Sequence, residues 1–83
     1  MKIGIGADHR GIRLKRKITK FLQSLGHQVV DYGTDSEVSV DYPDIAFRLA
    51  QDLAQRKMRF GILMCYTGQG MAMTANKVRG VRA

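Results

Sequence analysis

The stretch MCYTGQGMA, residues 64–72, brings together the residue types from which a reactive site could be built. Cys65, the only cysteine of the chain, precedes glycines at positions 68 and 70 and then residues that favour a helix. Glycines allow the backbone to approach a ligand closely, and the start of a helix presents unpaired N–H groups and a positive dipole to an anion. The same field favours a thiolate at Cys65, which could then serve as a general base or a nucleophile.

A purely structural role for Cys65 is also consistent with its surroundings. The preceding run, FGILM, is nearly all apolar, and a free cysteine is among the most buried residue types in proteins. Composition and spacing leave both roles open, whereas the position at the end of a predicted strand favours the chemical one.

The glycine spacing does not fit the common nucleotide-binding loops. In the dinucleotide fingerprint G-x-G-x-x-G/A the last position is small, but the pattern that starts at Gly68 reaches Met73 and the one that starts at Gly4 reaches His9. No Gly-Lys-Ser/Thr follows the glycines, so a Walker loop is excluded as well. We therefore expect no nicotinamide cofactor.

Asp8, His9 and Tyr42 are the other side chains with candidate roles. Asp8 and His9 directly follow the first predicted strand. Asp8 could accept hydrogen bonds from sugar hydroxyls or merely cap the next helix, because aspartate is a favoured N-cap. His9 could exchange a proton near neutral pH or bind a phosphate oxygen. Tyr42 could form a pocket wall or pack beside Pro43.

The apolar pattern along the chain predicts the elements that must position these residues. Strands are predicted at residues 2–7, 27–33 and 60–65, with a fourth beginning in GVRA at the C-terminus. Helices are predicted up to about Leu25, from Asp41 or Pro43 through the apolar stripe at 45–54, and over 71–78, with a polar loop at 34–43. The apolar face of the first helix is predicted at Leu14, Ile18, Phe21, Leu22 and Leu25.

The alternation of strands and helices predicts an α/β fold with a doubly wound parallel sheet. The expected architecture is a three-layer α/β/α, Rossmann-like domain that is incomplete in this chain, because three strands and the start of a fourth make half of an ordinary sheet of this kind. Ligands of such sheets bind beyond the carboxyl ends of the strands, which places ADHRG, DYGTD and CYTGQG at one edge. An unfinished sheet leaves backbone groups unpaired, so we expect a homodimer or a higher homo-oligomer.

The composition is that of a soluble chain with a single domain over residues 1–83. Of these residues, 45% are hydrophobic and 25% are charged, and one is proline. A single cysteine excludes an intramolecular disulfide and makes a metal cluster improbable, so we expect no metal and a cytoplasmic location. The apolar runs are too short for a signal peptide or a membrane span.

The net charge of +7 suggests nucleic-acid binding as one function to consider. Six of the fourteen basic residues fall within residues 10–20, where they also fit the solvated face of a helix. No aromatic residues alternate with these charges to stack on bases, and no zinc or helix-turn-helix signature is present. We therefore expect a general attraction for anionic ligands but no nucleic-acid partner.

Four motifs occur in order along the whole chain: GADHRG, DYGT, DYPD and CYTGQGMAMTANKVRGVRA. Together they resemble the ribose-5-phosphate isomerase B family, which includes galactose-6-phosphate and allose-6-phosphate isomerases. The resemblance implies the N-terminal half of a sugar-phosphate isomerase domain. It also implies a metal-free aldose–ketose isomerase of carbohydrate metabolism, most directly converting ribose 5-phosphate to ribulose 5-phosphate through an enediolate in the pentose phosphate pathway.

The resemblance also implies roles for individual residues. Cys65 would be the base that moves a proton between the two carbons, and Thr67 would help to open the sugar ring. The backbone amides of the loop 66–70 would stabilise the developing oxyanion. The implied substrate-binding residues are Asp8, His9, Tyr42, Tyr66, Gly68, Gln69 and Gly70, with His9 on the phosphate or hydroxyl side.

The chain departs from the family in two respects. Tyr66 stands where the family usually has glycine, and its side chain could narrow the pocket or alter the sugar preference. Family members continue for about as many residues again, and that part carries a histidine proton donor, an asparagine and phosphate-binding arginines. Loss of an acid–base partner lowers a rate by about 10²- to 10⁴-fold. We expect the isolated chain to be weakly active or inactive, and the alternative function is a sugar-phosphate-binding remnant.

Overall fold

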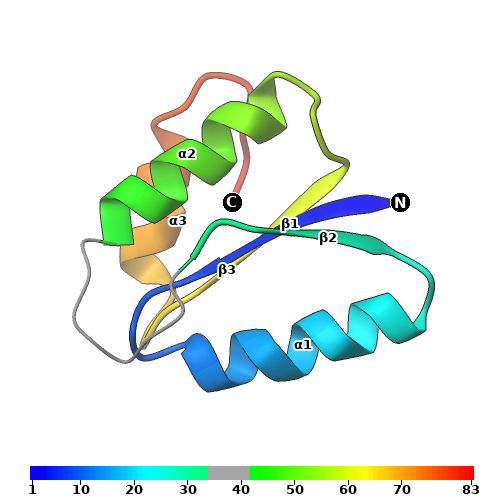
Figure 1. Ribbon diagram of the computed structural model, residues 1–83. Helices are drawn as coiled ribbons and strands as arrows, with labels where there is room; N and C mark the ends of the chain where they lie inside the picture. Colours follow the sequence, from blue (N-terminus) through cyan, green and yellow to red (C-terminus); the bar gives the residue numbers. More distant parts are fainter. Residues whose placement is uncertain (34–41) are drawn as a thin grey trace.

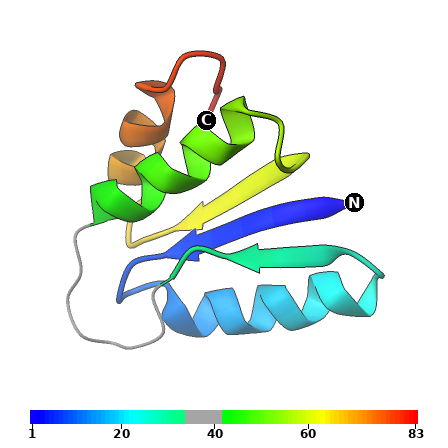
Figure 2. The same ribbon diagram turned by 45° about the horizontal axis from the view of Figure 1, so that its top comes forward.

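A computed structural model describes residues 1–33 and 42–83, which form three strands and three helices. In chain order they are β1 (Lys2–Ala7), α1 (Ile12–Ser24), β2 (Gln28–Asp31), α2 (Tyr42–Ala54), β3 (Phe60–Met64) and α3 (Gln69–Asn76). The strands, which Figure 1 labels, are parallel and lie in the order β2-β1-β3, as Figure 2 shows. The predicted α/β class is confirmed, while Asp41 and most of the predicted loop lie outside the described residues. None of the described helices has the length and apolarity needed to cross a membrane.

Isoleucine and glycine alternate along β1, and each type faces a different layer of helices. Ile3, Ile5 and Ala7 are at most 5% exposed. Ile5 and Ala7 form a buried cluster with Met64 of β3, and Ile18 of α1 packs against it. The branched side chains of β1 therefore supply the core beneath α1.

The glycine face of β1 allows α2 to approach the sheet closely. A Cβ atom added to Gly6 would lie only 2.8 Å from Cγ2 of Ile45, so no side chain fits between them. Ile45 and Ala46 of α2 form the second buried cluster with Met71 of α3. Figure 2 shows the resulting three layers, with α1 on one face of the sheet and α2 and α3 together on the other.

The buried face of α1 differs from the prediction. Three of the five predicted apolar positions are more than half exposed: Leu14, Phe21 and Leu25. The helix instead buries Ile12 and Lys15. The Nζ atom of Lys15 lies 3.0 Å from both carboxylate oxygens of Asp31 at the end of β2. Because the apolar stem of Lys15 packs inside while its charge is paired, α1 turns away from the face that the larger apolar residues predict.

The predicted fourth strand is wrong, since residues 80–83 form no strand. Gly80 turns the chain after α3 with a φ angle of 91°. The amide N–H of Ala83 then donates to Oδ1 of Asn76 at 2.8 Å, and Nδ2 of Asn76 donates to the carbonyl oxygen of Ala83 at 3.1 Å. The N–H and C=O groups of Ala83 are thus bound to the side chain of Asn76 and are not available for pairing with β3.

Arg56 follows α2 in a backbone conformation that favours glycine. Its φ angle is 61°, and the N–H of Lys57 donates to the carbonyl oxygen of Asp52 at 3.0 Å, as in a Schellman turn. A side chain at such a position costs about 1 kcal/mol. We expect Arg56→Gly to raise the free energy of unfolding by about 0.5–1 kcal/mol in urea titrations. An unchanged or lowered value would contradict this explanation.

Tyr32 and Asp52 form a hydrogen bond that makes stability depend on pH at both extremes. The phenol of Tyr32 donates to the Asp52 carboxylate at 2.5 Å. Burial, followed by this hydrogen bond, raises the pKa of Tyr32 from 10.0 to about 12. The same hydrogen bond is the main cause that lowers the pKa of Asp52 below 3.8. The contribution of Tyr32 is therefore complete below pH 10 and is lost toward pH 12, and that of Asp52 is present above about pH 4 and is lost in acid.

We expect Tyr32→Phe to flatten both limbs of the stability profile. Thermal melts across the acid and alkaline ranges should show a smaller fall in Tm for the variant than for the parent chain. Tyr66→Phe serves as the control, because Tyr66 is 73% exposed and should leave the profile unchanged. Parallel profiles for the parent chain and Tyr32→Phe would rule out the role of this pair.

Candidate active site

The candidate site lies at the carboxyl ends of β1 and β3, which are neighbours in the sheet. Ala7 pairs with Met64 as the last step of their ladder. The next residues, Asp8 and Cys65, therefore leave the sheet side by side. The N–H of Asp8 still donates to the carbonyl oxygen of Met64 at 3.1 Å, so the two loops are tied together at their bases.

The loop after β3 folds around the sulfur of Cys65. The N–H of Gly68 donates to Sγ at 3.1 Å, and Gly68 has a φ angle of 79°, which turns the chain into α3. The next N–H, that of Gln69, donates to Oγ1 of Thr67 at 3.3 Å. Cys65 is half-buried and packs against the cluster between α2 and α3. Cys65 therefore shows features of both roles that the sequence leaves open. It packs like a structural cysteine, and its sulfur is held at the start of α3.

Asp8 shapes the loop after β1. Its side chain is 7% exposed, and Oδ1 accepts the N–H groups of Arg10 at 2.9 Å and Gly11 at 3.2 Å. One carboxylate oxygen thus closes the turn that precedes α1. The N-cap of α1 is Gly11, with no side-chain cap hydrogen bond, so the expectation that Asp8 caps this helix is wrong. Gly11 follows in a crowded position, where an added Cβ would lie 2.9 Å from the carbonyl oxygen of Met64.

Tyr42, the first residue of α2, lies against the glycine loop. A Cβ atom added to Gly70 would come within 2.7–2.8 Å of the phenol ring and hydroxyl of Tyr42. Glycine at position 70 is therefore required for the ring to rest on the first turn of α3. This contact brings a residue from α2 to the two strand ends.

These side chains meet in a pocket of about 250 Å³. Six of its lining residues are among those predicted from the sequence: Asp8, Tyr42, Cys65, Tyr66, Thr67 and Gly70. The other three predicted residues are not part of its lining. His9 is half-buried, and its Nδ1 atom is buried with no hydrogen-bond partner among the described residues. Gly68 holds the sulfur from outside the pocket, and Gln69 is exposed.

Arg10 is the pocket residue that the sequence did not single out. Its guanidinium carbon lies 5.0 Å from the centre of the Tyr66 ring, and both side chains line the pocket. The contact is a cation–π pair, which holds a positive charge at the edge of the site. Its place between His9 and Gly11 in the first motif was the available signal, whereas its charge places it among the basic residues 10–20.

The arrangement contains the groups that proton transfer beside a carbonyl requires. A thiol can act as base, and the N–H groups of Gly70 and Met71 in the first turn of α3 have no acceptor within the described residues. Such donors can stabilise a developing oxyanion. Residues 1–33 and 42–83 contain no group of three His, Cys, Asp or Glu side chains placed to hold a metal ion.

Comparisons with known proteins agree on one family. A family model described as Ribose/Galactose Isomerase matches residues 3–83. D-erythrulose-4-phosphate isomerase of Pectobacterium atrosepticum is 46% identical over 84 residues, covering 100% of this chain and 55% of that protein. Ribose-5-phosphate isomerase B of Escherichia coli is 43% identical, with 99% and 55% covered. The solved structure of Clostridium thermocellum ribose-5-phosphate isomerase B gives a TM-score of 0.96 at 48% identity, with 99% and 55% covered. The chain therefore spans about half the length of these relatives.

Proposed function

Because this chain belongs to the ribose/galactose isomerase family, we propose that it is a metal-free sugar-phosphate isomerase that interconverts an aldose and a ketose. Ribose 5-phosphate and ribulose 5-phosphate are the proposed pair. The observation that carries the proposal is the Gly68 N–H bound to the Cys65 sulfur at 3.1 Å, beside a pocket at the strand ends. This contact keeps the sulfur beside the start of α3 and the lining of the pocket.

In the proposed mechanism, Cys65 moves one proton between adjacent carbons. Its thiolate removes the proton from C2 of the open-chain aldose, and the electron pair moves to the carbonyl oxygen on C1, giving an enediolate. The hydroxyl proton passes from O2 to O1, and the thiol returns its proton to C1, which leaves the ketone at C2. The free N–H groups of Gly70 and Met71 stabilise the oxyanion, while Thr67 assists ring opening.

Arg10 and Tyr66 determine where the phosphate binds in this proposal. Arg10 is the cation of the pocket lining, and guanidinium groups bind phosphate oxygens through two parallel hydrogen bonds. The Tyr66 ring orients the guanidinium from below. Asp8 has one oxygen committed to the turn, which leaves the other to accept a sugar hydroxyl.

An isomerase assay with the purified 83-residue chain tests the proposal. The substrate is ribose 5-phosphate, the product is ribulose 5-phosphate, and D-erythrulose 4-phosphate is the second substrate. We expect turnover about 10²- to 10⁴-fold slower than that of the Escherichia coli relative. Turnover as fast as that of the Escherichia coli relative would contradict the expected low activity. If neither substrate is converted, the proposal that the chain is an isomerase is wrong.

A second candidate is a sugar-phosphate-binding protein without turnover. It is supported by Arg10 in the pocket lining, because a guanidinium group binds phosphate without any proton transfer. Calorimetry distinguishes the two candidates, because this alternative requires saturable binding of ribose 5-phosphate by a chain that yields no ketose.

We also propose a homodimer or higher homo-oligomer in the cytoplasm. The support is the sheet itself, in which β2 and β3 are both edge strands, and the exposed side chains of Leu14, Phe21 and Leu25 along α1. Light scattering that reports a monomer at micromolar concentration would count against the assembly.

A further inference from the structure

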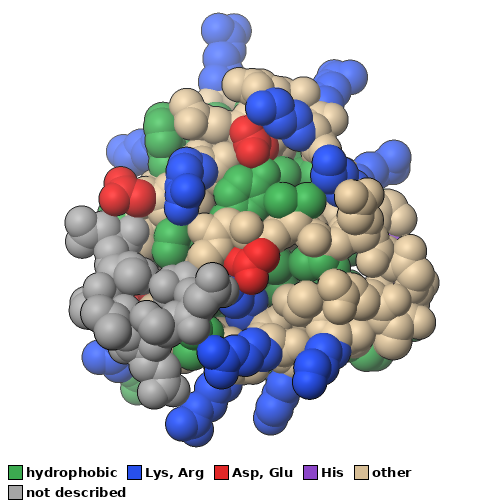
Figure 3. Space-filling view, in the orientation of Figure 1, with side chains coloured by type: hydrophobic (Ala, Val, Ile, Leu, Met, Phe, Trp, Pro, Cys, Tyr) green, Lys and Arg blue, Asp and Glu red, His purple; other side chains and the backbone are tan. Residues whose placement is uncertain are grey.

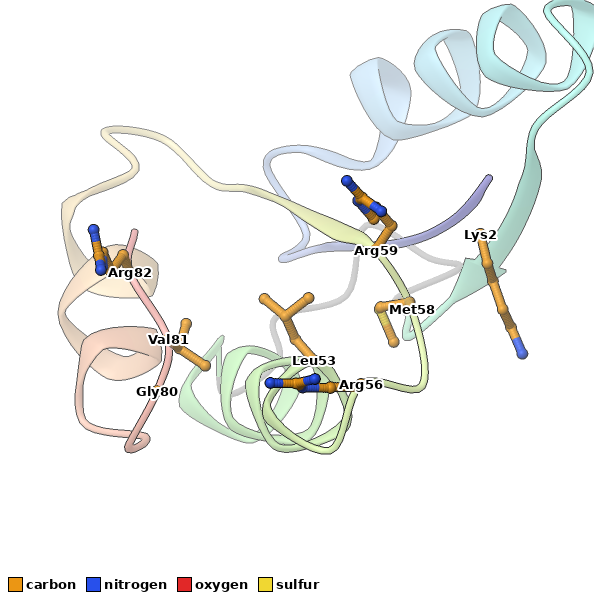
Figure 4. Close-up of a pocket in the computed structure, with 8 residues that line it drawn as sticks. All are labelled: Lys2, Leu53, Arg56, Met58, Arg59, Gly80, Val81 and Arg82. Carbon is orange, nitrogen blue, oxygen red and sulfur yellow. The ribbon is translucent and has the colours of Figure 1, made fainter.

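A second cavity, of about 740 Å³, lies at the amino-terminal ends of the strands, at the opposite edge of the sheet from the candidate active site. The end of α2, the segment that leads into β3 and residues 80–82 enclose it. Leu53, Met58 and Val81 form its apolar lining, and Figure 4 shows Leu53 between the other two. The volume is within the range of about 300–1,000 Å³ that is typical of small-molecule sites.

The remaining side chains of this cavity are cationic. They are Lys2, Arg56, Arg59 and Arg82. Within residues 1–33 and 42–83, no carboxylate forms an ion pair with any of the four. Residues 53–83 contain six Lys or Arg and no Asp or Glu, and the carboxylate just before them, that of Asp52, binds Lys57 and Tyr32. Four positive charges that have no carboxylate partner among the described residues therefore lie around one apolar surface.

The backbone at Arg56 adds an independent observation. Its φ angle of 61° would suit glycine better, so the side chain is kept at a cost in stability. Figure 4 shows its guanidinium extended beneath Leu53 toward the segment that contains Val81, with Arg59 on the other side of Leu53 in this view. Strained positions of this kind concentrate where a side chain has a functional role.

We propose that this cavity binds a small anion that carries two or more phosphate groups. A single phosphate fills only part of the volume, whereas a chain of phosphates can meet several guanidinium groups, each of which binds phosphate through paired N–H donors. The apolar lining accommodates an organic part of such a ligand. The site lies apart from the pocket of Cys65, so it does not depend on the isomerase function.

A nucleic acid fits the observations less well than a compact ligand. Figure 3 shows one group of Lys and Arg side chains along the lower part of the visible face and others separately in its upper half, so the basic side chains do not form one continuous stripe. No aromatic side chain lines the cavity to stack on a base. Figure 4 shows Lys2 and Arg82 at opposite ends of the cavity, with Arg56 and Arg59 on either side of Leu53 between them, so the charges border a surface of limited size.

Calorimetry with inorganic tripolyphosphate and the 83-residue chain tests the proposal at about 150 mM salt, where weak surface attraction is screened. We expect saturable one-to-one binding. Arg59→Gln should weaken it at least about tenfold, since a charge-assisted pair is lost. Arg56→Gly should weaken it similarly without lowering Tm, which separates binding from folding. Lys17→Gln, which removes an exposed charge from α1, should change affinity less than about twofold.

Four outcomes would overturn the proposal. One is the absence of saturable tripolyphosphate binding. Another is equal weakening by Lys17→Gln and Arg59→Gln, which would show attraction to net charge alone. The third is displacement of tripolyphosphate by a short RNA that binds more tightly, which would make the surface a nucleic-acid site. Amide chemical-shift changes confined to residues 53–59 and 80–82 would support the location, and changes confined to residues 65–70 would contradict it.

Discussion

Replacement of Cys65 by alanine is expected to abolish the exchange of the C2 proton of ribose 5-phosphate with solvent deuterium. NMR in D₂O measures this exchange directly, and it detects a working base even when complete turnover is slow. The sulfur is the candidate base of the pocket, and loss of a general base lowers a rate by about 10²- to 10⁴-fold. We expect the exchange rate of the variant to fall to the uncatalysed level.

Cys65→Ser is the matched variant for this experiment. Serine keeps an atom that can accept the Gly68 N–H now donated to sulfur at 3.1 Å, so the loop should remain folded while the base is weakened. Both variants should lose exchange, and the amide shifts of the loop should move only in Cys65→Ala. Exchange that persists in Cys65→Ala would assign the proton transfer to another group. No exchange in the parent chain would favour the binding remnant.

The second large effect is expected at Gly11, where the loop after β1 contacts the end of β3 at Met64. A Cβ atom there would lie 2.9 Å from both the carbonyl oxygen and the Cβ of Met64. That carbonyl accepts the N–H of Asp8 and precedes Cys65, so it has little freedom to move. We expect Gly11→Ala to lower the free energy of unfolding by about 1–3 kcal/mol in urea titrations. The exchange rate per folded molecule should also fall, because Asp8 and Cys65 are pushed apart.

Gly26→Ala is the control for the same chemical change. Gly26 has a φ angle of 88°, but no atom lies within 4 Å of an added Cβ, and it follows α1 far from the pocket. It should cost about 1 kcal/mol of stability and leave the exchange rate of the folded fraction unchanged. If the Gly11→Ala variant is as stable and as active as the parent chain, the contact between position 11 and Met64 tolerates a side chain.

Much of the scaffold could be predicted because the apolar pattern and the turns point to the same elements. The strands and helices lie close to their predicted positions, and parallel pairing follows from their alternation. The face of α1 could not be predicted, because its orientation depends on Lys15 reaching Asp31 in a later strand. The prediction of a fourth strand was wrong for a similar reason. The side chain of Asn76 forms two hydrogen bonds with the backbone of Ala83, and the apolar pattern of the sequence does not indicate these contacts.

The same distinction applies to the candidate site. Asp8 and Cys65 could be placed near each other because the carboxyl ends of neighbouring parallel strands meet at one edge. The role of Arg10 could not be predicted, because its direction is set by the ring of Tyr66. His9 was predicted from its place in the motif, but it does not line the pocket. The direction of a side chain in a tight turn depends on backbone angles that the motif does not specify.

The central position of β1 has a consequence for how the molecule is made. β1 is synthesised before both of its partners, which are residues 28–31 and residues 60–64. The nascent chain must therefore keep one edge of β1 unpaired until β3 has left the ribosome, and pairing over such sequence separation is slow. The two sides of the candidate pocket join only when β3 pairs with β1. A ligand of the pocket recognises only the finished fold, so its occupancy would slow unfolding without speeding folding.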